Sequence, residues 1–448
     1  MMGTQKHCSL DRFPGDWGYP VVGSAFDLVK NPLAFSRERV ARFGEISRLR
    51  LGPERGLMVV GADAFRTILT DSQFQFSARE GYSNQLGRFY EGGLLLRDGA
   101  DHKGQRRLMQ QVFKFTTMRE YVPRIEQMVI RQIEEWPKQQ YFAFYPAIKS
   151  ALLEIGSDIF LGIETLGEDS AQVHQSFLDI AAGLGSIFPW NLPGTNIRRG
   201  INGRNRLHAF IRESIPQRRQ GAGVDMFSLL AQAQTEEGDR YSDLDICQHV
   251  AFLLFAAHDT TTSLLSHLMM YLGKHPEWQA QLRLEMQALN SSTLSWDDQD
   301  RMPTLKTVLD EVLRLHPPVP LMVRKTFGEV ELGGRSIPKG TMLYLPSSFN
   351  QRDSRYWTNP DAFDPERFKA HRAEDKQHPF IFHPFGGGAH KCIGMHFAYL
   401  LSRVFLFHLL QRYEISLPSQ HQPKLAWIPI PYPVDGPPVR LGTIERTA

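Results

Sequence analysis

The chain has 448 residues, of which 42% are hydrophobic and 22% are charged, and its net charge is +3. This composition is typical of a soluble globular protein with a large core. The small net charge argues against a dedicated nucleic-acid-binding protein. Three cysteines are too few and too scattered for a disulfide framework, which fits a reducing cytoplasm.

The first thirty residues are interrupted by charged residues and prolines, so they contain neither a signal-peptide core nor a membrane span. We therefore expect no membrane anchor. No Gly/Ser tract, charge block or internal repeat divides the chain. We expect a single domain over residues 1–448.

Secondary-structure signals place helices in most of the chain. Asn31-Pro32 has the form of a helix start, with the helix running to about Phe43. Alternation over 46–51 and 57–60 predicts a small hairpin. The pattern over 61 to about 315 is mostly helical, and strands return at about 322–345 and 412–442. The stretch 346–392 is irregular, and such a long run in a compact chain is usually functional. The predicted class is mainly α with small β-sheets.

Two donors in the first half of the helical region are one turn apart. His102 and Arg106 have the spacing that suits gripping one carboxylate, although a solvated helix face has the same pattern.

A long central helix is predicted from Ser242, its N-cap, to Leu272, about 45 Å at 1.5 Å per residue. Its middle, residues 250–257, is apolar all round and should be buried. The polar run 258–262 follows directly, and burying it would be costly unless its groups are paired or have a function. One threonine could simply bond back to the carbonyl four residues earlier. Asp259 beside Thr260, after the small Ala256 and Ala257, favours a proton relay.

The pair Glu311 and Arg314, three residues apart, shares one face of a helix. Taken alone it is an ordinary surface ion pair worth a few tenths of a kcal/mol.

Residues 385–394, Phe-Gly-Gly-Gly-Ala-His-Lys-Cys-Ile-Gly, form a glycine loop that ends at Cys392. Glycines let a backbone bend sharply and lie close to a flat ligand. A thiolate at Cys392 can bind a metal, and N–H groups at the start of the following helix 393–411 should lower its pKa. Phe385 would shield the sulfur. The alternative is a glycine turn with a buried, inert cysteine.

The spacing Phe-x-x-Gly-x-x-x-Cys-x-Gly resembles the haem-thiolate signature of the cytochrome P-450 family. The resemblance covers nearly the whole chain, because the proline-rich lead-in, helical body, long central helix, irregular stretch, cysteine loop and final helix follow the family's order. It implies the cytochrome P-450 fold, with the long helix over haem b and Cys392 as the axial iron ligand. His390 stands where the family usually has arginine, and Ala257 where it usually has glycine. Without an anchor, the chain resembles soluble bacterial members, which implies a cytoplasmic protein.

The resemblance also implies roles for other residues. Asp259 and Thr260 would deliver protons to bound O2, with Ala256 leaving room over the haem. Arg367, in Pro365-Glu366-Arg367-Phe368, would join Glu311 and Arg314 in a buried network that braces the cysteine loop. The residues implied to bind the haem are Cys392, His102, Arg106, Arg324, His390, Phe385 and Ala256.

A substrate pocket is implied above the haem, with an apolar wall of the kind most ligand sites have. The segment 188–195 resembles the lid of retinoid- and terpenoid-oxidising members. A carboxylate on the substrate could meet Arg79, Tyr82, Arg88 or Tyr90. The residues implied for the wall are Leu94, Leu95, Phe188, Trp190, Phe252, Phe255, Val319, Leu321 and Met322. Each of them could equally belong to the core.

The function implied is a monooxygenase that inserts one atom of O2 into a C–H bond of a long lipophilic substrate such as a fatty acid, retinoid or terpenoid. Two electrons would come ultimately from NAD(P)H through a ferredoxin or flavodoxin-like donor with its reductase. A basic patch suits an acidic donor; its residues are Lys103, Arg107, Lys114, Arg119 and Lys391. The alternatives are a peroxide-driven or isomerising haem-thiolate enzyme, and a haem-based sensor or lipid-binding protein without turnover.

Overall fold

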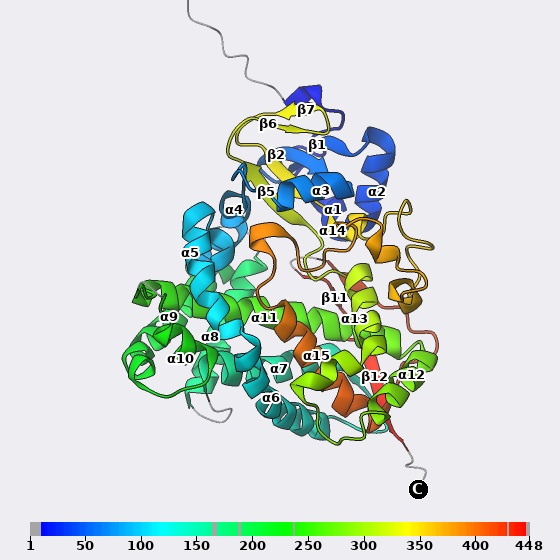
Figure 1. Cartoon of the computed structure of the whole chain (residues 1–448). Helices are drawn as coiled ribbons and strands as arrows, with labels where there is room; N and C mark the ends of the chain where they lie inside the picture. Colours follow the sequence, from blue (N-terminus) through cyan, green and yellow to red (C-terminus); the bar gives the residue numbers. More distant parts are fainter. Residues whose placement is uncertain (1–9, 164–167, 187–189, 236–237, 428–429, 445–448) are drawn as a thin grey trace, which may run out of the picture.

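The computed structural model describes residues 10–163, 168–186, 190–235, 238–427 and 430–444. Cys8 and Phe188 lie outside the described residues. Figure 1 shows a helical body with a small sheet region on one side of it.

Helices account for most of the described chain. They are α1 (Ala25–Lys30), α2 (Pro32–Phe43), α3 (Ala62–Leu69), α4 (Ala78–Tyr90), α5 (Gly99–Met109), α6 (Phe115–Glu135), α7 (Phe144–Gly156), α8 (Glu168–Leu184), α9 (Asn196–Gln220), α10 (Met226–Gln232), α11 (Asp243–Leu272), α12 (Pro276–Gln287), α13 (Pro303–Leu315), α14 (Ser347–Asn350) and α15 (Met395–Leu410). Short 3-10 turns include η2 (Leu94–Leu96), η5 (Trp296–Arg301) and η8 (Gly388–His390).

The main sheet has the strand order β1-β2-β8-β5-β3, with β1 (Ile46–Leu51), β2 (Glu54–Val59), β3 (Phe76–Ser77), β5 (Met322–Thr326) and β8 (Met342–Leu345). β1 and β2 are the predicted hairpin, and β2 pairs with β8 in parallel. A three-stranded sheet joins β4 (Tyr141–Ala143), β12 (Pro438–Thr443) and β9 (Tyr413–Ser416). Two pairs complete the strands: β6 (Val330–Leu332) with β7 (Arg335–Ile337), and β10 (Leu425–Ala426) with β11 (Tyr432–Pro433).

The predicted class, mainly α with small sheets, is confirmed. The helix predicted from Asn31 to Phe43 is α2, and the Asn31 side chain accepts from the Ala34 N–H at its start. The long central helix is α11, and Ser242 caps it by accepting from the Asp245 N–H. The region 346–392 has no β-strand in the described structure, as expected.

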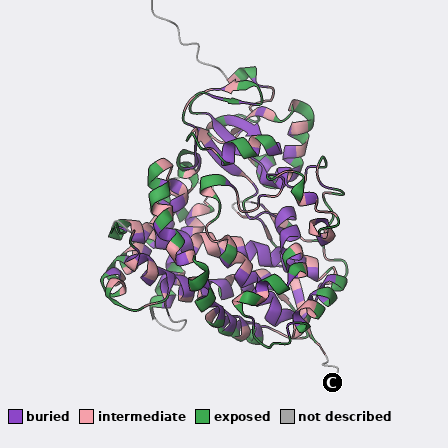
Figure 2. Ribbon diagram, viewed as in Figure 1, coloured by how far each residue is buried: buried purple, intermediate pink, exposed green. Residues whose placement is uncertain are grey.

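Helix α11 crosses the middle of the molecule and is buried along most of its length (Figures 1 and 2). It packs against α7, α9, α13 and α15. Burial on nearly all sides explains why its apolar residues lack the one-sided pattern of a surface helix.

By length and composition alone, one stretch, Gly388–Leu410, could cross a membrane, but 67% of its window is buried inside the protein. Most of that stretch is α15, whose residues 400–410 are all buried, the apolar ones in the main hydrophobic core. A buried core helix can be as long and as apolar as a membrane span, so packing in the core explains the apolar character of α15.

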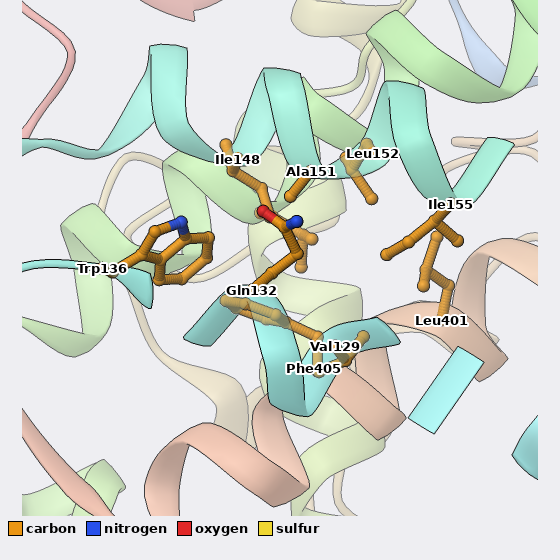
Figure 3. Close-up of a pocket in the computed structure, with 10 residues that line it drawn as sticks. Val129, Gln132, Trp136, Ile148, Ala151, Leu152, Ile155, Leu401 and Phe405 are labelled. Atoms are coloured by element: carbon orange, nitrogen blue, oxygen red, sulfur yellow. The ribbon is translucent and has the colours of Figure 1, made fainter. Parts of the chain in front are cut away.

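The core among α6, α7, α11 and α15 is closely packed. A cavity of about 10 Å³ lies there, lined by Val129, Gln132, Trp136, Ile148, Ala151, Leu152, Ile155, Leu265, Leu401 and Phe405. Figure 3 shows the side chains around it. A space of this size holds one water-sized sphere at most. Packing this tight makes a lost side chain costly, because the surroundings relax only partly.

The segment before the cysteine loop is held to α13 by a buried ion network. Arg314 makes two bonds to Glu311, at 2.7 and 2.8 Å, and Arg367 donates to the same carboxylate at 3.1 Å. All three side chains are fully buried. Arg367 also bonds Glu374 at 2.8 Å, which adds a fourth member.

Each guanidinium also donates to backbone carbonyls of the irregular segment. Arg314 bonds the carbonyls of Gln351 and Pro360, and Arg367 bonds that of Thr358. Trp357 lies against both cations, with ring centroids 5.0 and 5.8 Å away. The network therefore replaces regular secondary structure as the support of residues 351–367.

We predict that Leu265→Ala lowers the free energy of unfolding by about 2–5 kcal/mol, because it enlarges a cavity that cannot collapse. Leu265 is fully buried, whereas Leu284 on α12 is 67% exposed. The control Leu284→Ala should change the free energy by less than about 0.5 kcal/mol. Urea unfolding followed by circular dichroism measures both. Equal effects of the two substitutions would contradict this description of the core.

We predict that Glu311→Gln destabilises the protein by about 3–5 kcal/mol, since it leaves the buried Arg314 guanidinium without a counter-charge and Arg367 with Glu374 alone. The control is Glu366→Gln, which removes the partly exposed ion pair with Lys369 in the same segment and should cost about 1 kcal/mol or less. Thermal unfolding compares the two variants. A Glu311→Gln protein as stable as the control would show that the network does not support this region.

Candidate functional site

The cysteine loop is held by its own backbone. The Cys392 N–H donates to the Phe385 carbonyl at 2.9 Å, and the Lys391 N–H donates to the Gly388 carbonyl at 3.1 Å. Phe385 packs its ring 5.3 Å from that of Tyr399 on α15. The loop thus presents Cys392 three residues before α15 begins.

The loop glycines meet protein neighbours. Gly386 and Gly388 have φ values of +68° and +60°, which favour glycine. A β-carbon on Gly388 would lie 1.9 Å from the Leu69 carbonyl oxygen, and one on Gly387 would lie 2.5 Å from the Phe380 ring. The positive φ values agree with the expected sharp bend, and packing on α3 and Phe380 further requires glycine at 387 and 388. Approach of this loop to a flat ligand stays a prediction.

The surroundings of the Cys392 sulfur contradict one expectation. Desolvation by the protein raises the pKa of the thiol, although the Gly394 N–H and the charges of Arg106 and Lys391 act to lower it. We expected a net decrease from the following helix. The Gly394 amide does bond the sulfur, but one amide and two cations do not offset desolvation. Cys392 is nevertheless accessible to solvent.

Four basic side chains from three regions meet near Cys392. His102 lies on α5 with its ring 4.0 Å from that of His390, and Arg106 and Arg324 are close enough to lower the pKa of both imidazoles. Burial is the main cause of the shift for His102, whose pKa falls to about 3. Asp98 lies 3.5 Å from His390 and also accepts from Ser77 and Ala78. The cluster therefore has more basic groups than acidic ones.

These residues fit a haem. The Nε2 atom of His102 is buried without a hydrogen-bond partner among the described residues, so it is a polar atom that a ligand could satisfy. Arg106 and the buried Arg324 bring two guanidinium charges, which is costly unless an anion balances them, and haem carries two carboxylates. No group of three His, Cys, Asp or Glu side chains in the described chain could hold a bare metal. A single cysteine therefore suits an iron whose other ligands come from a macrocycle.

The middle of α11 is open on one side. Phe255, Ala256, Ala257, Asp259 and Thr260 are half-buried, while the residues on either side along the helix are buried. This patch is the accessible part of an otherwise buried stretch of the helix. Ala256 belongs to it, and its role beside the haem stays a prediction.

Asp259 is fixed by an ion pair and a hydrogen bond. Its Oδ1 lies 3.1 Å from Lys149 Nζ on α7 and 3.0 Å from His258 Nδ1. Burial alone would raise the pKa of Asp259, but the bond to His258 and the charge of Lys149 outweigh it, so the pKa is lowered. Asp259 is therefore ionised at neutral pH.

The Thr260 hydroxyl donates to the Ala256 carbonyl at 2.7 Å, the back-bonding pattern of a helical threonine. Thr262 makes the same bond to the His258 carbonyl. A hydroxyl that donates to a carbonyl can still accept a hydrogen bond through its lone pairs. The bond to the Ala256 carbonyl is therefore compatible with a role of Thr260 in proton transfer.

An aromatic cluster covers the patch on α11. The Tyr90 ring stacks on Phe255 at 4.6 Å and meets Phe252 edge-on at 5.8 Å. Gly93 makes close approach possible, because a β-carbon there would lie 2.8 Å from the Phe252 ring. Leu94 and Leu95 follow in η2. Leu94 is buried in the hydrophobic core that contains Tyr90 and Phe252, and Leu95 is partly buried and packs against that core.

The other predicted wall residues lie elsewhere. Met322, the first residue of β5, is buried, Leu321 just before it is half-buried, and Val319 is 38% exposed. Trp190 is 60% exposed. The structure thus brings Leu94, Leu95, Phe252 and Phe255 together, but not Trp190.

An open groove of about 810 Å³ runs beside the cysteine loop. Its lining is aromatic and mixed in charge, with Phe115, Trp296, Phe385, Lys391 and Tyr399 among its residues. Phe115 is 57% exposed and contacts Trp296. Of the predicted basic patch, Lys103, Arg107, Lys114, Arg119 and Lys391 are all exposed, and Arg119 pairs with Asp297.

Sequence reasoning missed Lys149, Asp98 and Glu374. Lys149 meets Asp259 only because α7 packs on α11, and the two residues are 110 positions apart. Glu374 lies in the expected irregular stretch, yet nothing in its sequence context marks it. His258 was included in the polar run, but its bond to Asp259 depends on the ring's orientation.

Comparison with known proteins identifies the family. A family model described as cytochrome P-450 matches residues 14–429. A Mycobacterium tuberculosis sequence provisionally named cytochrome P-450 136 is 32% identical over 437 residues, covering 95% of this chain and 88% of that protein. Cytochrome P-450 26A1 of Danio rerio is 29% identical, covering 99% of this chain and 93% of that one.

A solved structure, retinoic acid bound cyanobacterial CYP120A1, superimposes with a TM-score of 0.86 at 29% identity, covering 96% of this chain and 99% of that chain. The predicted fold is therefore confirmed, and with it the haem-thiolate cofactor that the family implies. The chain belongs to the cytochrome P-450 family of haem-thiolate monooxygenases.

Proposed function

We propose that this monooxygenase inserts one oxygen atom of O2 into a C–H bond of a long lipophilic isoprenoid, of the retinoid or terpenoid kind. The observation that carries this is the aromatic wall on α11. Phe252, Phe255 and Asp259 are three and four residues apart, so they share one face of the helix. An apolar chain lying against this wall would reach the Asp259 and Thr260 positions.

The relatives support the substrate class. They include a taxane 13-alpha-hydroxylase of Taxus cuspidata, a beta-amyrin 28-monooxygenase of Saponaria officinalis and an abscisic acid 8'-hydroxylase of Arabidopsis thaliana. CYP120A1 was solved with retinoic acid. All four compounds have isoprenoid carbon skeletons, and two are carboxylic acids.

Residues of the chain would hold the cofactor at its iron and at its carboxylates. Cys392 would bind the iron through its sulfur, and His102, Arg106, Arg324 and His390 would balance the two carboxylates of haem b. Haem iron with an axial thiolate supplies the reductive cleavage of O2. Phe385 and the loop backbone keep the sulfur in place.

Protons would reach the site along α11. Asp259 exchanges a proton at its carboxylate, and Thr260 accepts a hydrogen bond while donating to the Ala256 carbonyl. General acid chemistry by a positioned carboxyl contributes about 10²- to 10⁴-fold to a rate. The apolar wall keeps bulk water away from this pair, which favours controlled proton delivery.

Two electrons per turnover would come from NAD(P)H through a ferredoxin or flavodoxin-like donor and its reductase. The open groove beside the cysteine loop is the docking site in this proposal, with the exposed basic residues of the patch around it. Charge complementarity would speed the encounter. The chain would act as a single cytoplasmic haem domain in lipid metabolism.

We predict that isoprenoid acids change the spin state of the haem on binding, because a lipophile against α11 displaces water from the distal face. Absorption titrations with retinoic acid, retinol, abscisic acid and a saturated fatty acid measure this, followed by product analysis with a donor system. The isoprenoids should shift the spectrum and be hydroxylated. If no isoprenoid gives either a shift or a product, the proposed substrate class is wrong.

Phe255→Ala should weaken isoprenoid binding by about two- to tenfold, since contacts of an aromatic ring with another π-system are worth about 0.5–1.5 kcal/mol beyond the area they bury. The matched control is Phe115→Ala, which removes an exposed aromatic of the open groove and should leave these titrations unchanged.

A further inference from the structure

His258 makes two hydrogen bonds that no neutral imidazole can make at once. Its Nε2 lies 2.8 Å from the Lys149 carbonyl oxygen, and its Nδ1 lies 3.0 Å from Asp259 Oδ1. A carbonyl oxygen only accepts, so Nε2 must carry a hydrogen. An ionised carboxylate also only accepts, so Nδ1 must carry a hydrogen as well.

Either neutral tautomer would place two acceptors face to face. With hydrogen on Nε2 alone, the Nδ1 lone pair would face Asp259; with hydrogen on Nδ1 alone, the Nε2 lone pair would face the Lys149 carbonyl. The pair of His258 and Asp259 therefore holds one proton more than a neutral ring beside a carboxylate.

Oδ1 of Asp259 already accepts from the Lys149 ammonium at 3.1 Å, which favours the ionised carboxylate. The lowered pKa of Asp259, despite burial that would raise it, agrees with this. Lys149 is partly exposed, so solvent stabilises its charge beside the imidazolium.

The ring is sealed from bulk water. His258 is 3% exposed, and Phe177 packs edge-on against it at 4.8 Å. The titratable groups around the pair come from every neighbouring element: Lys149 and Tyr145 on α7, Tyr90 on α4, His174 on α8 and Tyr432 on β11. Asp259 is therefore the acid in direct contact with the ring, and Thr260 is next to it in the chain.

We propose that His258 stores a proton for Asp259 and is a positioning residue of the proton relay. This inference rests on the relay assigned to Asp259 and Thr260 in the proposed function. In the transfer, the Nδ1–H bond breaks and an Oδ1–H bond forms, leaving a neutral ring whose Nε2–H still donates to the Lys149 carbonyl.

The store would be refilled from solvent. Once Asp259 has passed its proton toward Thr260, the Lys149 ammonium gives a proton to Oδ1, and Oδ1 returns it to Nδ1. Solvent water then protonates the Lys149 amine. One proton enters from water for each one delivered, and no electrons move.

The first test is nuclear magnetic resonance of the holoenzyme labelled with ¹⁵N-histidine, in its diamagnetic reduced, carbon monoxide-bound form. We predict that His258 has both ring nitrogens protonated at pH 7.5, and that Asp259→Asn converts it to the neutral ring. The matched control is His249, buried on the same helix, with Nε2 bonded to Gln105 and Nδ1 unpartnered among the described residues. It should be neutral, because burial lowers its pKa to about 3.

The His258 signals are assigned by their loss in His258→Gln, with His258→Asn as a second variant should the first fail to fold. A neutral His258 at pH 7.5, or a doubly protonated ring that persists in Asp259→Asn, would overturn the proposal.

The second test measures product formed per electron pair. We predict roughly a tenfold fall in His258→Gln, less than a full general-acid contribution because Lys149 and water remain; unchanged coupling would overturn the stored-proton role. Thr260→Ala should lower coupling while leaving the His258 signals intact. If Thr260→Ala is fully coupled, the assigned relay fails even where the protonated ring is found, so the two failures are distinguishable.

Discussion

The proposed function depends on the position of one sulfur atom, that of Cys392. Cys392 is held by a backbone bond to Phe385, by the Gly394 amide, and by a loop whose glycines fit against Leu69 and Phe380 without space for a β-carbon. Behind the loop, the Glu311 network supports an irregular segment that has no sheet to stabilise it. Every proposed role on α11 presupposes an iron bound at this sulfur.

Two sets of buried charged groups lie in different parts of the protein, and each has its own partners. The basic cluster of His102, Arg106, Arg324 and His390 fits the haem carboxylates. Asp259 is instead paired within the helical body, with Lys149 and His258. Buried charge is thus either balanced by a neighbour or oriented to a ligand, as the cost of desolvation requires.

The sequence predicted those helix starts that are determined by neighbouring residues in the chain. Asn31-Pro32 and Ser242 marked helix starts that the structure has at the same residues. The cysteine loop was recognised by spacing. What escaped prediction depends on packing between distant segments, such as Lys149 with Asp259 and Glu374 with Arg367. The direction of the Cys392 pKa shift was wrong because desolvation cannot be judged from neighbours in the chain. Trp190, which the family resemblance implied for the pocket wall, is 60% exposed, and the sequence did not reveal that exposure.

The most direct test of the account is the absorption spectrum of the reduced, carbon monoxide-treated protein. Thiolate ligation by Cys392 predicts the red-shifted band that is characteristic of a sulfur-bound haem. Cys392→Ser should abolish that band, while Cys247→Ser, which alters the buried cysteine of α11, should preserve it. A red-shifted band that survives Cys392→Ser, or its absence from the unaltered protein, would contradict the central claim.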